Sequence, residues 1–141
     1  MERSFVIIKP DAMHTGLGGA IISRLEAQGL RVVGVKLIHM DRAMAENHYR
    51  VHRGKAFFNE IIDFMTSASV MAIVFEGKNA VQVIRQAMGV TDPTKAVKGT
   101  IRGDFGVDVT HNVIHGADSA VQAEEEIKLY FRDDELFSGR K

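Results

Sequence analysis

Short apolar runs, separated by polar stretches that contain glycine, divide the chain into predicted strands. The runs are rich in Val, Ile, Leu and Phe, which favour extended backbone that is buried on at least one side. Pro10 follows the first run. Because the residue before a proline disfavours helix, we expect that strand to end there and to present Lys9 at its mouth. The predicted strands cover residues 5–9, 30–39, 70–75 and 113–115.

Between the runs, apolar residues recur every three or four positions, which is the spacing of a helix with one buried face. Asp41 and Ser119 are residue types that favour helix N-caps, and Ser119 with Gln122 matches a capping box. Gly29 and Gly89 follow two of these segments and are typical helix-ending residues. The predicted helices cover residues 20–28, 41–54, 57–65, 80–88 and 119–131, the third with Phe57, Ile61, Phe64 and Met65 on one face.

Three stretches lack a clear periodic pattern. Residues 11–19 contain three glycines and predict a loop, and the polar tail at 132–141 is expected to be frayed. Residues 90–111 are also polar and weakly periodic. A loop of that length in a compact domain is usually functional, or the assignment as a loop is wrong.

The order of these elements predicts the fold class. Strand, helix, strand, helical hairpin, strand, helix, strand and helix contain two strand–helix–strand units in succession. This order is typical of a ferredoxin-like βαββαβ sandwich, an α/β (α+β) fold in which helices cover one face of a four-stranded antiparallel sheet. With 141 residues and no internal repeats or linkers, we expect one domain over residues 1–141.

Charge and cysteine content narrow the classes of function. The 18 Lys and Arg residues are balanced by 18 Asp and Glu residues, so no global field draws the protein to nucleic acid or to an anionic membrane. Any polyanion must therefore be bound by a local cluster of cations. The lack of cysteine excludes disulfides, thiolate zinc sites and a thiol nucleophile. With no leader-like segment and no apolar run of about 18 residues, we expect a soluble cytoplasmic protein without membrane contact.

Several short motifs fail the requirements of the sites they suggest. The glycines of segment 16–19 lack the third glycine and the acidic partner of a dinucleotide fingerprint, so we interpret this segment as a turn. The Gly-Lys pairs at 54–55 and 77–78 lack the flanking residues of a Walker loop. His48 and His52 have the spacing of a metal pair, but no acid stands between them as a third ligand, so we expect a solvated helix face.

One segment has the character of a reactive site. His115 ends a short apolar run and is followed by Gly116 and by Asp118-Ser119 at the start of a helix. Glycine allows close backbone approach, and the amides of a helix N-terminus favour an anion. These residues suit a histidine that meets an anion, although a histidine that merely ends a strand would show the same pattern.

Three motifs together resemble one known family. They are Lys9-Pro10-Asp11, Thr100-Ile101-Arg102-Gly103-Asp104-Phe105 and Asn112-x-x-His115-Gly116-x-Asp118-Ser119, in the order and spacing of the nucleoside diphosphate kinase family, and the similarity covers residues 1–137. The resemblance implies ping-pong transfer of the γ-phosphoryl group of a nucleoside triphosphate, typically ATP, to a nucleoside diphosphate, through a phosphohistidine on His115. The chemistry agrees, because a neutral imidazole is a good nucleophile near neutral pH.

The resemblance also implies roles for other residues. The residues expected to contact the phosphates are three cations, Lys9, Arg85 and Arg102. Lys9 is also expected to take part in catalysis. Phe57 is expected to stack on the base, with Val109 on the base's other side. Because stacking tolerates any base, broad base specificity follows. The remaining nucleotide contacts implied by the resemblance are Tyr49, Thr91, Asn112 and Gly116.

The expected partner of His115 is an acid in the last helix. An imidazole nucleophile needs an acceptor at its far nitrogen, which fixes the tautomer and stabilises positive charge. If the core face of this helix contains Ala123 and Ile127, Glu125 points away, whereas Glu124 and Glu126 flank that face on opposite sides. Periodicity leaves both of these open, and the resemblance selects Glu126 as the residue that orients His115.

Cofactors and partners are also implied by the resemblance. We expect Mg²⁺ carried on the nucleotide phosphates, with Asp118 near the ion and without a protein cage. We expect nucleoside di- and triphosphates as partners, no specific nucleic acid, and a homo-oligomer that is a hexamer rather than a tetramer. Ala117 departs from the family's usual serine, whose hydroxyl supports the glutamate beside the histidine, so we expect an active enzyme with a softer site. The alternative function is a non-catalytic ferredoxin-like module that binds a nucleotide or RNA, because fold alone does not separate the two.

Overall fold

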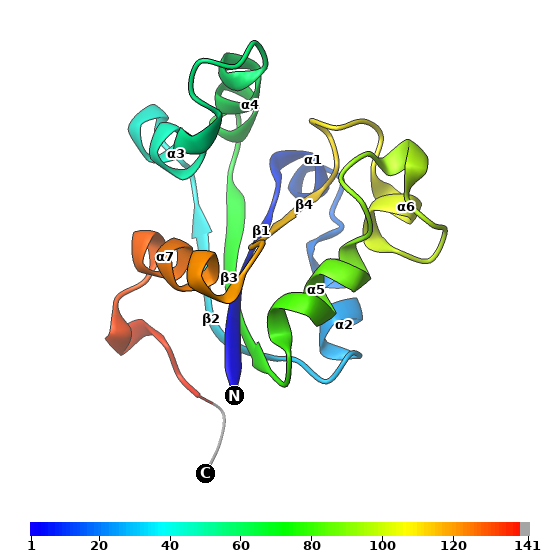
Figure 1. Ribbon diagram of the computed structural model, residues 1–141, viewed down its shortest axis with the longest axis vertical. Coiled ribbons are helices and arrows are strands. Elements are labelled where there is room, and N and C mark those ends of the chain that lie inside the picture. Colours follow the sequence, from blue (N-terminus) through cyan, green and yellow to red (C-terminus); the bar gives the residue numbers. More distant parts are fainter. Residues whose placement is uncertain (139–141) are drawn as a thin grey trace.

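A four-stranded antiparallel sheet forms the centre of the molecule (Figure 1). The computed structural model describes residues 1–138. The strands lie in the order β2-β3-β1-β4, so the first strand of the chain is central and pairs with the third and fourth. The strand pairing confirms the predicted ferredoxin-like class. The strands are β1 (Glu2–Ile8), β2 (Arg31–Ile38), β3 (Val70–Gly77) and β4 (Ile114–Gly116).

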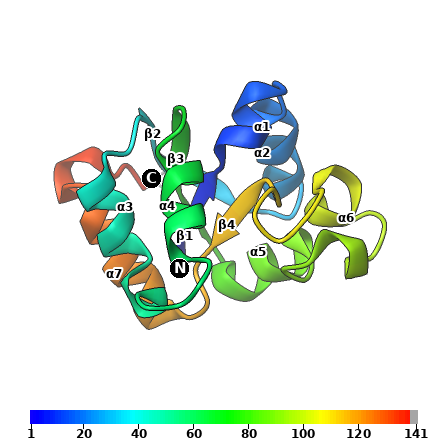
Figure 2. The ribbon, with the colours of Figure 1, turned by 90° about the horizontal axis from the view of Figure 1, so that it is seen from above.

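Helices pack on both faces of this sheet, as Figure 2 shows. On one face lie α3 (Arg42–His48), α4 (Phe58–Met65) and α7 (Ala120–Tyr130). On the other lie α1 (Pro10–His14), α2 (Gly18–Glu26), α5 (Ala80–Met88) and α6 (Ile101–Phe105). The prediction that helices cover only one face was therefore wrong. Burial on both faces explains why the apolar run of β1 is continuous, because only a strand with one solvent-exposed face needs alternating polar residues.

Residues of β1 divide between two cores. Phe5 and Ile7 face α3, α4 and α7, whereas Val6 and Ile8 face the opposite helices, and all four are fully buried. Alternate side chains of a strand point to opposite faces, so one short segment contributes to both cores. The same strand ends just before Lys9, so a central strand that is buried on both faces places this cation at one end of the sheet.

Two stretches expected to be loops contain short helices. Pro10 opens α1, which continues into the predicted 11–19 loop, because proline fits the first turn, where no backbone donor is needed. The 90–111 stretch holds a 3₁₀ segment (Pro93–Lys95) and α6. Both begin at side-chain caps: Asp92 accepts from Thr94 N at 3.0 Å, and Thr100 accepts from Gly103 N at 3.1 Å. Helices of three to five residues show no periodicity, so only these caps could have revealed them.

Helices α3 and α4 differ in detail from the expected ones. Asp41 caps α3 as predicted, with Oδ1 accepting from Met44 N at 2.8 Å, but α3 ends at His48 and a 3₁₀ turn (Arg50–His52) follows. The buried face of α4 consists of Phe58, Ile62 and Met65. Phe57 precedes the helix as its N-cap and is 43% exposed, so its predicted place on one helix face with Met65 was wrong. An almost continuous apolar stretch fits several helical faces, which is why spacing misplaced it.

The predicted frayed tail is largely ordered against β2. Residues Asp133–Glu135 form a 3₁₀ turn, and Phe137 N donates to Val33 O at 2.7 Å. Gly34 allows this approach, because a Cβ there would lie 2.8 Å from Leu136 Cδ2. The expectation of fraying was wrong for residues 132–138, and its remainder, 139–141, lies outside the described residues. Within the described part of the chain, none of the helices is long and apolar enough to cross a membrane.

Helix α7 begins at the predicted cap. The Ser119 hydroxyl accepts from Gln122 N at 3.1 Å. In a capping box the Gln122 side chain would return to the Ser119 amide, but here it extends along the helix and donates to Glu126 Oε2. The N-cap prediction is therefore confirmed, while the side chain of Gln122 serves Glu126.

The cap at Ser119 provides a test of how α7 is anchored. We expect Ser119→Ala to lower the free energy of unfolding by about 1 kcal/mol, since it leaves a helix donor without its partner. Ser23→Ala, an exposed substitution inside α2, is the matched control and should leave stability unchanged or slightly higher. Urea unfolding followed by circular dichroism measures both. Equal stability of the two variants would show that the cap contributes nothing.

Candidate active site

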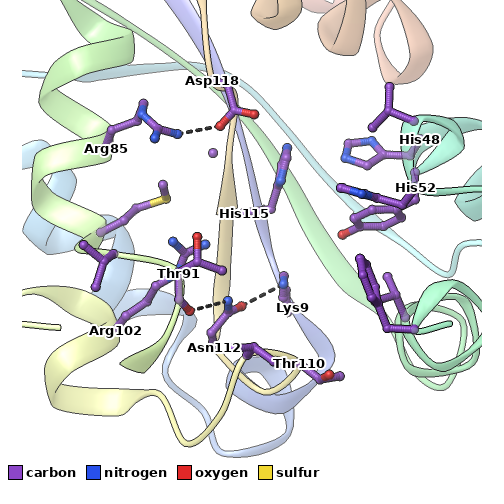
Figure 3. A pocket seen from close by; sticks show the side chains of 18 of the residues that line it. Lys9, His48, His52, Arg85, Thr91, Arg102, Thr110, Asn112, His115 and Asp118 are labelled. Atoms are coloured by element: carbon purple, nitrogen blue, oxygen red, sulfur yellow. Dashed lines mark hydrogen bonds and ion pairs between the residues drawn. The ribbon is translucent and has the colours of Figure 1, made fainter. Parts of the chain in front are cut away.

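One pocket of about 680 Å³ collects every residue that the sequence proposes for function (Figure 3). Its floor is the end of β1 and β4, one wall is α5 and the chain around α6, and the other wall is the segment from α3 to α4. Residues far apart in the sequence meet there because β1 and β4 are neighbours in the sheet. The sequence-proposed residues in its lining are Lys9, Tyr49, Phe57, Arg85, Thr91, Arg102, Val109, Asn112, His115, Gly116, Asp118 and Glu126.

His115 is fixed by the sheet at the floor of the pocket. It lies on β4 opposite Ile7 of β1, and 18% of its side chain is exposed. Gly116 lets β4 pack tightly against α5, since a Cβ there would lie 2.8 Å from Met88 Sδ. The glycine after the histidine is thus required by packing between strand and helix, in addition to leaving the backbone open to a ligand.

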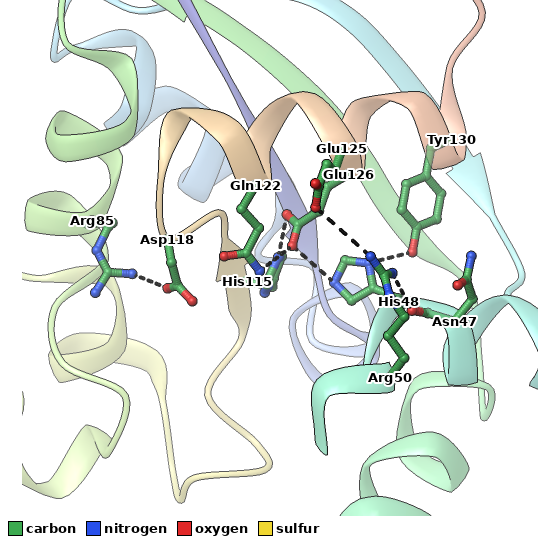
Figure 4. Close-up of polar contacts among 10 residues, drawn as sticks. All are labelled: Asn47, His48, Arg50, Arg85, His115, Asp118, Gln122, Glu125, Glu126 and Tyr130. Atoms are coloured by element: carbon green, nitrogen blue, oxygen red, sulfur yellow. Dashed lines mark hydrogen bonds and ion pairs between the residues drawn. The ribbon is translucent and has the colours of Figure 1, made fainter. Parts of the chain in front are cut away.

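Glu126 of α7 holds the far side of the His115 ring (Figure 4). Its Oε1 lies 3.0 Å from His115 Nε2, and its Oε2 accepts from Gln122 Nε2 at 3.1 Å. Glu126 is buried, whereas Glu124 and Glu125 are exposed. The geometry therefore distinguishes the two acids that periodicity left open, and it adds Gln122, which sequence reasoning missed.

Burial sets the charge of both partners. Burial, together with the positive charges of Lys9 and Arg102, lowers the pKa of His115 to about 3. Burial raises the pKa of Glu126 to about 7. His115 is therefore a neutral base at physiological pH. When the carboxylate of Glu126 accepts Nε2–H, the lone pair lies on Nδ1, so Nδ1 is the ring nitrogen that is free to accept a bond.

A half-buried lysine and a buried arginine lie beside His115 without acidic hydrogen-bond partners. Lys9 Nζ donates to Asn112 Oδ1 at 2.7 Å, and Arg102 donates to the carbonyls of Gly89 and Ile114 at 3.2 and 2.7 Å. Burial and the charge of Arg102 lower the pKa of Lys9 to about 8, and burial lowers that of Arg102 to about 10. Cations held this close, on neutral acceptors, indicate a site for an anion.

Arg85 and Asp118 complete the charged wall on the exposed side. Arg85 Nη1 donates to Asp118 Oδ1 at 2.5 Å, and both side chains are about half exposed or more. An exposed ion pair of this kind contributes little to stability, so both groups can exchange partners when a ligand enters.

The mouth of the pocket is apolar and open. Phe57 and Val109 are both exposed there, although large apolar side chains are normally buried. Between mouth and floor, Asn112 Nδ2 donates to Thr91 O at 3.0 Å, which orients the amide that Lys9 contacts. Tyr49 is buried, and its hydroxyl has no hydrogen-bond partner among the described residues. The lining thus changes from apolar at the mouth to cationic at the floor.

His48 was expected on a solvated helix face, and this was wrong. It is buried, with its ring centre 4.7 Å from that of His115, and its Nδ1 lies 2.9 Å from the Tyr130 hydroxyl. His52 is only half-buried and its Nδ1 contacts Lys55, so the two histidines do not form a pair. The signal was the spacing of Ala45 and His48, which share the buried face of α3.

Ala117 has an apolar environment. It is buried in a small cluster with Val81 and Ala123. Ala117 has no hydroxyl to donate to Glu126, and the side-chain amide of Gln122 donates to this glutamate instead. The expected softening of the site is thus opposed by a hydrogen bond from within α7.

Comparison with known proteins agrees with the resemblance in the sequence. A family profile described as nucleoside diphosphate kinase matches residues 2–136. The chain is 52% identical to the nucleoside diphosphate kinase of Archaeoglobus fulgidus over 141 residues, covering 100% of this chain and 93% of that protein. It is also 52% identical to the enzyme of Pyrococcus furiosus, covering 97% and 87% respectively. The solved halophilic enzyme of Halobacterium salinarum in complex with CDP superposes with a TM-score of 0.96 at 46% identity, covering 99% and 93%.

The lowered pKa of His115 gives a test of the site's electrostatics. We expect the imidazole to stay uncharged from pH 8 down to about 5, whereas in urea it should titrate near 6.5. Because the unfolded chain binds this proton first, the stability contributed by neutral His115 is complete above about pH 6.5 and is lost as the pH falls below it. Nitrogen-15 NMR of labelled histidine, assigned with His115→Gln, measures both titrations. A midpoint near 6.5 in the folded protein would contradict the account.

Proposed function

The chain belongs to the nucleoside diphosphate kinase family, whose enzymes are phosphotransferases, and we propose that His115 is the residue through which it transfers phosphate. In this proposal His115 accepts the γ-phosphoryl group of a nucleoside triphosphate and then passes it to a nucleoside diphosphate. The observation that carries it is the neutral imidazole, bound to Glu126 at the floor of a pocket that holds Lys9 and Arg102.

Each half-reaction is a displacement at phosphorus. Nδ1 of His115 contributes its lone pair to the γ-phosphorus, the bond from phosphorus to the β–γ bridging oxygen breaks, and the diphosphate leaves with that electron pair. The imidazole ring gains positive charge as the N–P bond forms, and the carboxylate of Glu126 on Nε2–H stabilises that charge. A nucleoside diphosphate then attacks the phosphoryl group and regenerates the neutral ring.

The cations neutralise the charge that the phosphates carry. Lys9 and Arg102 lie deepest and are held by neutral acceptors, so their charge is available to the transferred group and to its neighbour. Arg85 reaches the phosphates from the exposed wall once its contact with Asp118 opens. The hydroxyl and amide contacts come from Tyr49, Thr91 and Asn112, and the open backbone at Gly116 lets the phosphate approach the β4 strand.

The base lies at the apolar mouth. Phe57 offers an exposed ring for stacking, and Val109 offers an apolar surface on the opposite side. Stacking is insensitive to base identity, so we expect purine and pyrimidine nucleotides to be accepted. The related Halobacterium salinarum enzyme was solved with CDP, a pyrimidine nucleotide.

Mg²⁺ fits this site as an ion carried by the nucleotide. Asp118 is an exposed carboxylate on the pocket wall, and Mg²⁺ typically takes one or two carboxylates together with phosphate oxygens and waters. When bound, the ion supplies charge neutralisation on the phosphates. Asp118 would be its protein contact after releasing Arg85.

A homo-oligomer in the cytoplasm completes the proposal. Val35 and Leu37 lie on the edge strand β2 and are more than half exposed, which supports burial against another copy of the chain. The preference for a hexamer over a tetramer and the cytoplasmic location rest on the family resemblance. The non-catalytic RNA-binding alternative is disfavoured, because such modules present bases to an open sheet face and here helices cover both faces.

Transfer of label tests the role of His115. After incubation with γ-labelled ATP and removal of nucleotide, we expect one acid-labile label per chain, which moves to GDP when GDP is added. His115→Ala should take up no label, because its methyl group offers no nucleophile. His14→Ala, an exposed histidine at the end of α1, is the control and should label fully. Equal labelling of both variants would refute the assignment.

The pH dependence of kcat/KM tests Glu126 and Lys9 in the free enzyme. Below about pH 7 Glu126 is protonated and donates to Nε2, which moves the ring proton onto Nδ1, so kcat/KM should fall as the pH falls. Above about pH 8 Lys9 loses its charge, so kcat/KM should fall again. Lys9→Arg should remove the alkaline decline.

A pair of glutamate variants separates this effect from ionisation of the nucleotide. Glu126→Gln should lose the acidic decline and lower the plateau about 10–100-fold. Glu125→Gln, the exposed neighbour in α7, should keep the wild-type profile. The ratio of each variant to wild type across pH is the measurement. A parallel acidic decline in Glu126→Gln would show that another group causes it.

A further inference from the structure

Three side chains of types that bind metal ions, His115 among them, lie close together at the floor of the pocket. His48 comes from α3, His115 from β4 and Glu126 from α7, and one ligand atom of each lies within 4.8 Å of the others. All three residues belong to the lining of the pocket, and His115 is the most exposed of them. Figure 4 shows the two imidazoles on either side of the carboxylate.

The orientation of His48 points to a ligand. Its Nε2 is buried and has no hydrogen-bond partner among the described residues, while it faces Glu126 Oε2 at 3.9 Å. The other ring nitrogen, Nδ1, lies 2.9 Å from the Tyr130 hydroxyl. When Tyr130 accepts Nδ1–H, a lone pair on Nε2 faces a carboxylate oxygen. Two acceptors that face each other in a buried site are stabilised by a cation between them.

The donor set selects the class of cation. Two imidazole nitrogens and one carboxylate form a typical three-residue ligand set for zinc, in which water fills the fourth position. Zinc–nitrogen bonds are about 2.0–2.1 Å, so ligand atoms that lie within 4.8 Å of one another must approach by up to roughly 1.5 Å to share one ion. Mg²⁺ prefers oxygen ligands and is excluded from such a site. A metal-binding histidine usually donates a hydrogen bond from its other ring nitrogen, and here the Tyr130 hydroxyl lies where it can accept one from Nδ1 of His48.

We propose that His48, His115 and Glu126 form a binding site for Zn²⁺ or a similar transition-metal ion, and that this ion inhibits phosphorylation of His115. The inhibition, unlike the metal site itself, rests on the proposed function of His115. Coordination takes the lone pair of His115 Nε2, so the proton that Nε2 carried moves through water to Nδ1. The ring stays neutral and no proton is lost, but Nδ1 no longer has a lone pair to attack phosphorus.

Binding is tested first, without nucleotide. Co²⁺ alone is titrated into the full chain, and its visible absorption reports tetrahedral coordination. We expect one Co²⁺ per chain, displaced by Zn²⁺, and no such band in His48→Phe or Glu126→Gln. Tyr130→Phe removes only the hydroxyl and keeps the ring stacked on Phe5, so it should bind Co²⁺ about tenfold more weakly. Wild-type affinity in Tyr130→Phe and His48→Phe would overturn the site.

A matched control excludes a different histidine–acid pair. His111 Nδ1 lies 2.9 Å from Asp108 Oδ1, and both side chains are about half exposed. His111→Gln should keep the full Co²⁺ band. Loss of the band in this variant would place the metal at that surface pair and overturn the proposal.

Inhibition is then measured as formation of phosphohistidine from Mg²⁺–ATP at increasing Zn²⁺. We expect Zn²⁺ to suppress labelling of the wild type, and Tyr130→Phe to need about tenfold more Zn²⁺ for the same effect. Zn²⁺ bound to ATP affects every variant equally, so an unchanged inhibition in Tyr130→Phe would overturn the mechanism. If no enzyme forms phosphohistidine while the Co²⁺ band behaves as expected, the function of His115 fails and the metal site stands.

Discussion

The hydrogen bond between His115 Nε2 and Glu126, 3.0 Å long, is the interaction on which the site depends. It joins β4 to α7 and decides which nitrogen of the ring is free. Glu126 is buried and only 18% of the His115 side chain is exposed, so water competes little for the bond, and burial holds the imidazole neutral. Gln122 fixes the second carboxylate oxygen from one turn earlier in the helix. An imidazole held in this way has one free nitrogen without the help of a cysteine or of a strong external base.

The fold serves this bond by bringing three elements to one place. β1 is buried on both faces and delivers Lys9, β4 pairs with β1 and delivers His115, and α7 lies over β1 and delivers Glu126. The net charge of zero is therefore compatible with a strongly cationic site, because Lys9 and Arg102 are held by neutral acceptors while the acids lie mostly elsewhere. Positive and negative charges cancel over the whole chain, whereas positive charge is in excess at the floor of the pocket.

Long periodic elements were predictable from the sequence, and short or irregular ones were not. The bounds of α5 match the predicted helix at both ends, because Val81, Ile84 and Met88 form a regular stripe that Gly89 closes. α1 and α6 are too short for such a stripe. The residues of the site could be named only through the family resemblance, since spacing left Glu124 and Glu126 equivalent. His48 was misjudged because a polar residue on a buried helix face is recognised only when its partner, here Tyr130, is known.

The position of the phosphoryl group on the ring tests the central claim most directly. Glu126 occupies Nε2, so the account predicts that phosphate is carried on Nδ1. Phosphorus–nitrogen NMR of the phosphorylated, nitrogen-15 histidine-labelled enzyme distinguishes the two isomers by coupling and chemical shift. A phosphoramidate at Nδ1 of His115, with a proton retained on Nε2, is the predicted result. Phosphate on Nε2, or on another histidine, would contradict the role given to the bond between His115 and Glu126.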